Sequence, residues 1–162
     1  MTVVLYRIGV DTPDYESDDL TGKGAEKTGG RWNRVGVAMI YVSTSRALAC
    51  LETVVHLSKQ PLPFNRYLVE LSVSDELWAD ASVVSAADHV GWDAEPAGRV
   101  SMSWGDSWAA AGKARAAPVL MKVPSVVIRE EWNVLINPLH PDAGGIMARK
   151  IRKFVYDPRL RS

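Results

Sequence analysis

The sequence predicts an α+β fold in which strands dominate. Most of its patterned segments are short, apolar or alternating, and rich in β-branched residues, as strands are. Helical spacing of apolar residues is confined to separated segments, which do not alternate with strands as in a doubly wound parallel sheet. With 162 residues, 47% hydrophobic and 23% charged, the chain fits one globular domain spanning residues 1–162.

Charge and composition disfavour several classes of protein. The 19 basic residues balance 19 acidic ones, so we expect no direct nucleic-acid binding and no attraction to anionic lipid. The single cysteine, Cys50, cannot form an internal disulfide, and no apolar leader follows Met1, so we expect a cytoplasmic protein. No segment approaches the roughly 20 apolar residues of a membrane helix.

The first part of the chain predicts two strands separated by a long polar segment. Residues 3–10 (VVLYRIGV) and 37–43 (VAMIYVS) are the strands. Residues 11–30 predict a loop or a short helix, with a functional loop and a plain surface excursion both open. Alternation in the second strand predicts two faces, with Met39, Tyr41 and Ser43 on one and Ala38, Ile40 and Val42 on the other.

A helix is predicted directly after the second strand. Three residues can cap it by accepting from free backbone N–H groups of the first turn: Ser43, Thr44 and Ser45. Its expected buried stripe consists of Leu48, Leu51 and Val55. We expect this helix to continue through residues 58–60 and to end at Pro61.

The rest of the chain predicts strands around one more helix. Residues 66–73 (RYLVELSV) alternate as a half-buried strand does, whereas residues 80–103 give no assignment. Residues 105–118 predict a helix capped by Asp106 and stopped by Pro118. The remaining strand predictions are residues 119–128, with a break at Pro124–Ser125, residues 131–138, and an edge strand over 154–158.

Glu52 is a charged residue within an apolar stripe. It lies four residues after Leu48 and three before Val55, so it shares their side of the predicted helix. An isolated buried charge is very costly, so this carboxylate must be paired, hydrogen-bonded or next to a cavity. Two interpretations stay open: an ion pair with His56 at the edge of the stripe, or a carboxylate facing a ligand cleft.

Arg31 and Tyr41 are the other candidates in this region. Gly29 and Gly30 allow close backbone approach or a positive φ, and the planar guanidinium of Arg31 suits phosphate oxygens. The alternative for Arg31 is a glycine turn with its side chain stacked on Trp32. Tyr41 is either a core residue or part of the same cleft, because its strand leads into the helix that carries Glu52.

Other types of site have less support. The three histidines and the cysteine lack metal-ligand spacing, so no metal site is expected: His56, His89, His140 and Cys50. No Ser–His–Asp motif, P-loop or GxGxxG fingerprint is present. Four tryptophans are predicted to be core residues and not base-stacking platforms: Trp92, Trp104, Trp108 and Trp132.

Several motifs together resemble the RES domain family. They are GGRWN-x2-G-x4-Y-x-S-x3-A-L-A-x2-E-x3-H from residue 29, VPS from residue 123, and EWNVLINPLHPD from residue 131. Members of this family are toxins encoded beside Xre-type antitoxins. The resemblance implies a fold similar to that of ADP-ribosyltransferases, a split, bent β-sheet with flanking helices around an NAD cleft. It further implies a helix-turn-helix antitoxin as partner and allows a homodimer within that complex.

The resemblance also implies an activity and its residues. Family toxins deplete NAD⁺ by cleaving its nicotinamide–ribose bond, with water or phosphate as acceptor, while some relatives modify a protein. NAD⁺ is then the substrate and no separate cofactor is needed. Functional positions of the family fall on Arg31, Tyr41, Glu52 and Ser125, with Asn137 as a weaker match.

Each of these positions has an expected role. Arg31 would bind the pyrophosphate, Tyr41 would stack on nicotinamide, and Glu52 would stabilise the cationic ribose. Ser125 would hold the ribose or the nicotinamide amide, unless it is an ordinary turn serine, and Asn137 would contact NAD⁺. A mono-ADP-ribosyltransferase using the same pocket and a catalytically silent interaction protein remain alternatives, and an RNA-cleaving toxin is disfavoured by the zero net charge.

Overall fold

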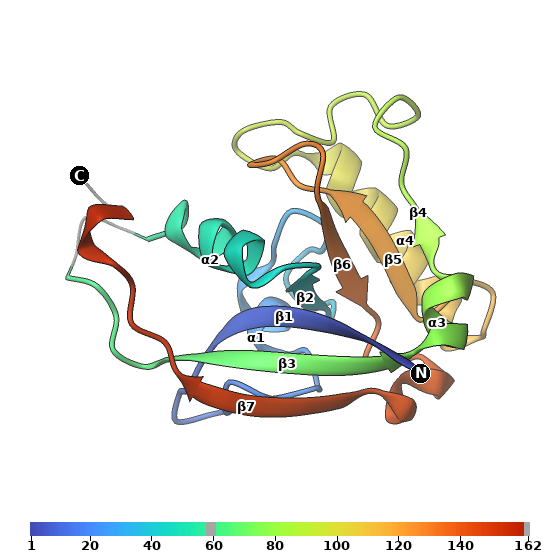
Figure 1. Ribbon diagram of the computed structural model, residues 1–162. Helices are drawn as coiled ribbons and strands as arrows, with labels where there is room; N and C mark the ends of the chain where they lie inside the picture. The colour runs from blue at the N-terminus through green and yellow to red at the C-terminus, as the bar shows by residue number, and fades with distance from the viewer. Residues whose placement is uncertain (58–60, 161–162) are drawn as a thin grey trace.

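One mixed β-sheet organises the computed structural model, which describes residues 1–57 and 61–160 (Figure 1). Its strand order is β4-β5-β6-β2-β1-β3-β7, and every neighbouring pair is antiparallel except β4 and β5. The strands are β1 (Thr2–Val10), β2 (Ile40–Ser43), β3 (Arg66–Ser74), β4 (Ser82–Val83), β5 (Leu120–Pro124), β6 (Trp132–Ile136) and β7 (Met147–Lys153). The helices are α1 (Lys23–Thr28), α2 (Arg46–Val54), α3 (Asp75–Asp80) and α4 (Arg99–Lys113), with 3-10 turns η1 (Pro141–Gly145) and η2 (Pro158–Leu160).

The sheet is split between β1 and β2. β1 pairs with β3 along its whole length, but it meets β2 only through Tyr6 and Ser43. Figure 1 shows β1, β3 and β7 running together, with β5 and β6 at a steep angle to them. We call these the β1-β3-β7 half-sheet and the β2-β6-β5-β4 half-sheet. The predicted α+β fold with a split, bent sheet and flanking helices is confirmed.

Helix α2 connects the two half-sheets. Ser45 is its cap, because the Ser45 hydroxyl accepts from the backbone N–H of Leu48 at 3.1 Å. The helix packs against β1 and β2 and buries Leu48 and Ala49. It ends at Val54, so the prediction of Val55 as a core residue is wrong; Val55 lies past the last turn and is 55% exposed. Residues 58–60 of the predicted helix lie outside the described residues.

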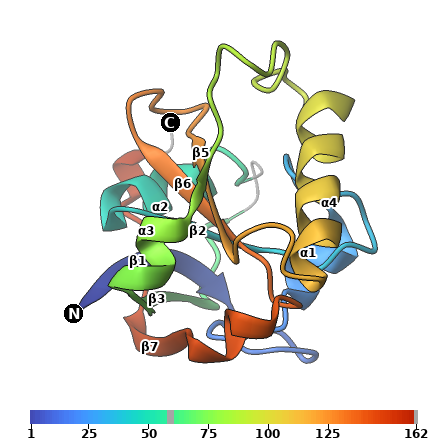
Figure 2. The same ribbon diagram turned by 90° about the vertical axis from the view of Figure 1, so that its right-hand side faces the viewer.

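The hydrophobic core confirms the predicted faces of the second strand. Ile40 and Val42 belong to a hydrophobic cluster that also contains Leu5 of β1 and Val69 of β3. Met39 and Tyr41 pack on the other side, with Trp108 of α4. Figure 2 shows α4 standing beside the β2-β6-β5-β4 half-sheet. In the part of the chain that the structure describes, no helix is long and apolar enough to cross a membrane.

Two element predictions in the second half of the chain are wrong. The helix predicted from residue 105 begins at Arg99 and ends at Lys113, so Asp106 lies inside it and does not cap it. Asp106 instead accepts from the backbone N–H of Arg34 at 3.0 Å. The final strand is β7 and not residues 154–158, where Tyr156 packs beneath α2 against Ala49. β7 has the sequence MARKIRK and is largely exposed. Because basic residues outnumber its apolar ones, the sequence pattern is that of a polar segment and did not predict a strand.

Gly105 determines how closely α4 approaches the loop before β2. A Cβ atom at Gly105 would lie 1.7 Å from the carbonyl oxygen of Trp32. Any side chain there would push α4 away from this loop. The loop carries Arg31, so the contact also fixes one wall of the cavity described below.

We expect Gly105→Ala to destabilise the fold by at least about 1–3 kcal/mol, the usual cost of overpacking a core. Thermal or urea unfolding measures it. Gly144→Ala is the matched control, because a Cβ at Gly144 meets nothing within 4 Å. Equal stability of the two variants would contradict this account of the contact.

Candidate functional site

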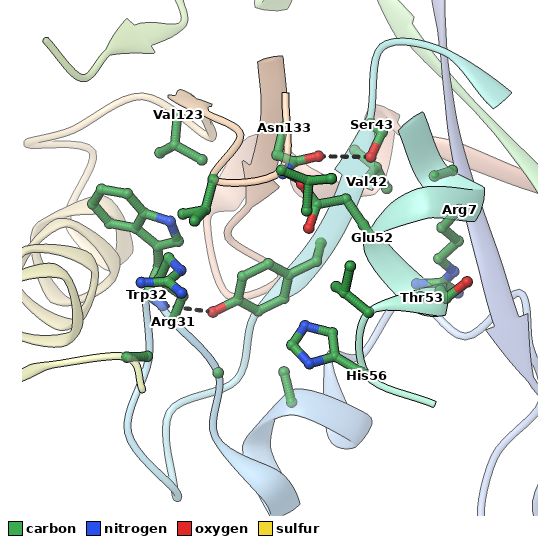
Figure 3. Close-up of a pocket in the computed structure, with 18 of the residues that line it drawn as sticks. Arg7, Arg31, Trp32, Val42, Ser43, Glu52, Thr53, His56, Val123 and Asn133 are labelled. Carbon is green, nitrogen blue, oxygen red and sulfur yellow. Dashed lines mark hydrogen bonds between the residues drawn. The ribbon is translucent and has the colours of Figure 1, made fainter. Parts of the chain in front are cut away.

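A cavity of about 1010 Å³ lies where the two half-sheets meet. Its walls come from β1, β2, β5, β6, α1, α2, α4, the loop before β2, the loop before α4 and the segment after β5. Its polar lining residues include Arg7, Arg31, Tyr41, Ser43, Glu52, Thr53, His56, Glu95 and Asn133. Cavities of this size bind cofactor-sized ligands. Figure 3 shows Arg31 and Glu52 reaching into the pocket from different sides.

Glu52 is held in the cavity wall by one of its two oxygens. Oε1 accepts from Ser125 Oγ and from Asn133 Nδ2, each at 2.6 Å. In residues 1–57 and 61–160, nothing donates to Oε2, and no hydrogen bond or ion pair joins Glu52 to His56. The structure therefore favours the interpretation of Glu52 as a carboxylate facing a cleft.

Ser125 acts on the site through Glu52. It is fully buried and does not line the cavity. Its hydroxyl accepts from the backbone N–H groups of Val127 and Ile128, both at 3.0 Å, and donates its only proton to Glu52. We expected Ser125 to contact a ligand, but the structure places it behind the carboxylate.

Asn133 is the residue that sequence reasoning missed. It lies on β6 and lines the cavity, and its amide donates to Glu52. A signal was present, because Asn133 is the polar residue of an otherwise apolar strand. Its contacts could not be found from this signal, since Glu52 lies 81 residues earlier.

The double glycine brings Arg31 to the cavity. Gly29 has a φ of 69°, and a Cβ at Gly30 would lie 2.7 Å from the Tyr41 hydroxyl. Arg31 does not stack on Trp32, which packs instead against Trp92 with ring centroids 6.3 Å apart. Only 17% of the Arg31 side chain is exposed.

The Arg31 guanidinium is held by the loop before α4. Nη1 donates to the carbonyl oxygens of Trp92 and Ala94 at 3.1 and 2.7 Å, and Nη2 pairs with the Glu95 carboxylate. Burial lowers the pKa of Arg31, and the Glu52 carboxylate acts in the opposite direction. Arginine stays charged at neutral pH, so the cavity has a cation on one wall and an anion on another.

Tyr41 supplies an aromatic wall. Its hydroxyl donates to Asn33 Oδ1 at 2.6 Å and accepts from the backbone N–H of Trp32 at 3.0 Å. Burial raises the pKa of Tyr41 further above its usual value, so the hydroxyl stays protonated and cannot serve as a base near neutral pH. Tyr41 also lines the cavity.

Asn137 lies away from the cavity. Its Nδ2 donates to the carbonyl oxygen of Ala109 at 2.9 Å, and its Oδ1 accepts from the backbone N–H of Leu139 at 3.1 Å. These bonds connect α4 to the turn after β6. The structure does not bring Asn137 together with the other predicted site residues, because both ends of its amide are used in the fold.

The tryptophan prediction is correct in part. Trp92 and Trp108 are buried, at 4% and 6% exposed, but Trp104 and Trp132 are 42% and 37% exposed. Within the described ranges, no group of three His, Cys, Asp or Glu side chains is placed to hold a metal ion.

The candidate site is built from Arg31, Tyr41, Glu52 and Asn133, which line the cavity, with Ser125 behind the carboxylate.

Comparison with known proteins identifies the family. The RES domain matches residues 4–157. The chain belongs to the RES domain family. This RES protein is 58% identical over 161 residues to a "Prs ADP-ribosylating toxin" of Sphingobium sp. (strain YBL2), covering 99% of this chain and 98% of the relative.

Two more distant relatives carry the name "Toxin Res". The one from Yersinia enterocolitica is 31% identical to this RES protein over 161 residues, which is 98% of this chain and 100% of the relative. The one from Pseudomonas putida is 30% identical over 144 residues, covering 88% of this chain and 92% of the relative.

Proposed function

We propose that this RES protein is a toxin that breaks the nicotinamide–ribose bond of NAD⁺. The observation that carries the proposal is the Glu52 carboxylate, which is anchored through Oε1 and turned toward a large cavity. The names of its RES relatives, which describe toxins and in one case ADP-ribosylation, support it. NAD⁺ is the substrate in this proposal, and no further cofactor is required.

Arg31 and Tyr41 would orient the dinucleotide. The planar Arg31 guanidinium suits the pyrophosphate, since a fork of N–H donors can bind two phosphate oxygens at once. The Tyr41 ring would stack on the nicotinamide, whose cationic form is attracted to an aromatic face. Both side chains lie in the same cavity as Glu52, so they can act on one ligand.

Glu52 would stabilise charge at the anomeric carbon. As the C1′–N bond breaks, its electron pair leaves with the neutral nicotinamide, and positive charge develops on the ribose. A carboxylate next to the ribose stabilises this charge, as carboxylates do in glycoside cleavage. A nucleophile then bonds to C1′ and releases its proton. Nicotinamide leaves as a neutral base and needs no general acid, in keeping with a single carboxylate at the reacting carbon.

The acceptor distinguishes two candidate activities. Water or phosphate would make the protein an NAD⁺ glycohydrolase or phosphorylase, whereas a protein side chain would make it an ADP-ribosyltransferase. The relative with 58% identity is named for ADP-ribosylation, and this favours the second candidate. The residues around the cavity bind the donor in either case.

One incubation tests these alternatives. Purified protein is mixed with labelled NAD⁺, alone, with phosphate, and with a lysate as a source of protein acceptors. Nicotinamide with free ADP-ribose or its phosphate indicates the first activity, and labelled lysate protein indicates the second. No nicotinamide under any of these conditions would reject the enzyme proposal and leave a catalytically silent interaction protein.

We propose a helix-turn-helix protein of the Xre type as the antitoxin, on the strength of the RES family membership. A DNA-binding partner fits a chain without net charge, since DNA contact would belong to the partner. Expression of this chain alone is expected to arrest growth, and co-expression of the partner is expected to restore it. Normal growth at good soluble expression of the chain alone would reject the toxin proposal.

Glu95 should compete with the ligand for Arg31. Its carboxylate pairs with Arg31, so a pyrophosphate that binds Arg31 must displace it. We expect Glu95→Gln to tighten NAD⁺ binding about two- to fivefold, because the Glu95 side chain is 68% exposed and such pairs contribute about 0.2–1 kcal/mol. Calorimetry in a Glu52→Gln background measures this without turnover.

The control for this experiment is Asp157→Asn. It removes a carboxylate of another exposed pair, with Arg159, and neither residue lines the cavity. Weaker or unchanged binding in the Glu95 variant would show that Glu95 does not occupy the anion position on Arg31.

A further inference from the structure

A chain of hydrogen bonds leads from the junction of the half-sheets to the Glu52 carboxylate. Ser43 Oγ lies 2.6 Å from Asn133 Oδ1, and Asn133 Nδ2 lies 2.6 Å from Glu52 Oε1. Ser43 is 4% exposed and ends β2, where its backbone pairs with Tyr6 of β1 on one side and Asn133 of β6 on the other. These hydrogen bonds therefore begin at Ser43, whose pairing with Tyr6 is the strand pairing between the two half-sheets among the described residues.

The direction of each bond follows from the carboxylate. An ionised carboxylate only accepts hydrogen bonds, so the Asn133 group facing Glu52 is the NH₂. The amide oxygen then faces Ser43, and the Ser43 hydroxyl must donate to it. Ser43 thus fixes the orientation of the Asn133 amide, and Asn133 in turn holds Glu52 (Figure 3).

Both anchors bind the same oxygen of Glu52. Asn133 and Ser125 each donate to Oε1, while nothing among the described residues donates to Oε2. A glutamate side chain that is free in solution loses considerable rotamer entropy when it becomes ordered. Two donors on one oxygen fix the carboxylate in advance and leave the second oxygen for a ligand.

We propose that Asn133 and Ser43 are positioning residues that aim Glu52 Oε2 at the ribose of NAD⁺. The inference rests on the proposed function. Asn133 holds the carboxylate directly and Ser43 acts only through Asn133. Neither residue takes part in bond breaking. Their loss should disturb the transition state more than the binding of NAD⁺, because an ill-placed carboxylate no longer meets the charge that develops at C1′.

The test compares Ser43→Ala, Asn133→Ala and the double variant in steady-state NAD⁺ cleavage. We expect Asn133→Ala to lower kcat about 10- to 100-fold, with KM changed by less than about threefold. Ser43→Ala should lower kcat about three- to tenfold. The double variant should be no slower than Asn133→Ala, because Ser43 has no target once the amide is gone.

The matched control is Asn65→Ala. The Asn65 amide also donates a hydrogen bond, to the carbonyl oxygen of Asp11, but lies outside the cavity lining. Its kcat should equal that of the parent. Thermal unfolding of every variant separates a loss of rate from a loss of fold.

Three results would overturn the proposal: an unchanged kcat in Asn133→Ala, an increase of KM alone, or independent additive losses in the double variant. If Asn133→Ala does not fold, Ser43→Ala and Ser43→Thr decide, since threonine keeps the hydroxyl. Parent-like kcat in Ser43→Ala would then reject positioning, and a slow Ser43→Ala with a faster Ser43→Thr would support it. A parent that releases no nicotinamide contradicts the proposed function instead.

Discussion

Glu52→Gln is expected to lower kcat for NAD⁺ cleavage by about 10²- to 10³-fold, the usual effect of losing one preorganised electrostatic partner. KM should change far less, because the charge that Glu52 stabilises develops only as the bond breaks. The substitution keeps the size of the side chain, and its amide oxygen can still accept from Ser125 and Asn133. The fold should therefore persist, and the variant should no longer arrest growth.

Glu70→Gln is the matched control for this prediction. Glu70 is also a paired carboxylate, bound by Arg46 and Arg149, but it does not line the cavity. Its loss should leave the rate of NAD⁺ cleavage unchanged. A Glu52→Gln protein that cleaves NAD⁺ at the parental rate would contradict the proposed mechanism.

Arg31→Ala is expected to act mainly on binding. Removing one partner of a buried charged pair costs about 2–5 kcal/mol. We expect a value near the lower limit, about 30-fold in the Kd for NAD⁺, because the parent must first release Arg31 from Glu95. Arg31→Lys should recover only part of the affinity, since an ammonium group cannot bind two phosphate oxygens as a fork. Calorimetry measures both variants.

Arg34→Ala is the control from the same loop. Arg34 pairs with Asp106 of α4 and does not line the cavity. The variant should bind NAD⁺ as the parent does. Thermal unfolding measures its stability separately. If Arg31→Ala binds NAD⁺ with the affinity of the parent, the prediction that Arg31 binds the ligand is wrong.

Local sequence signals predicted much of the first half of the fold. A cap within residues 43–45, which the structure assigns to Ser45, and the two faces of β2 were predictable because each depends on neighbouring residues. Helix α4 begins earlier than predicted because its N-cap, Gly98, makes no side-chain capping bond that could mark the start. β7 was missed because an exposed edge strand needs few apolar residues.

The site was predictable in its parts and not in its connections. Arg31, Tyr41 and Glu52 lie in consecutive elements, so their convergence could be expected from the order of loop, strand and helix. Ser125 and Asn133 reach Glu52 from 73 and 81 residues away. No local pattern specifies such contacts. The same holds for Glu95, which meets Arg31 across 64 residues.

These long separations have a consequence for synthesis of the protein. A ribosome makes the chain from its N-terminus, so Arg31, Tyr41 and Glu52 emerge well before Ser125 and Asn133. A nascent chain that stops before residue 125 carries Arg31, Tyr41 and Glu52 without the two donors that hold the Glu52 carboxylate in place. β6 would also be absent, leaving β2 without its neighbour on that side. Under the proposed mechanism, chains that end before β6 would therefore not cleave NAD⁺, and the activity would begin only with nearly complete molecules.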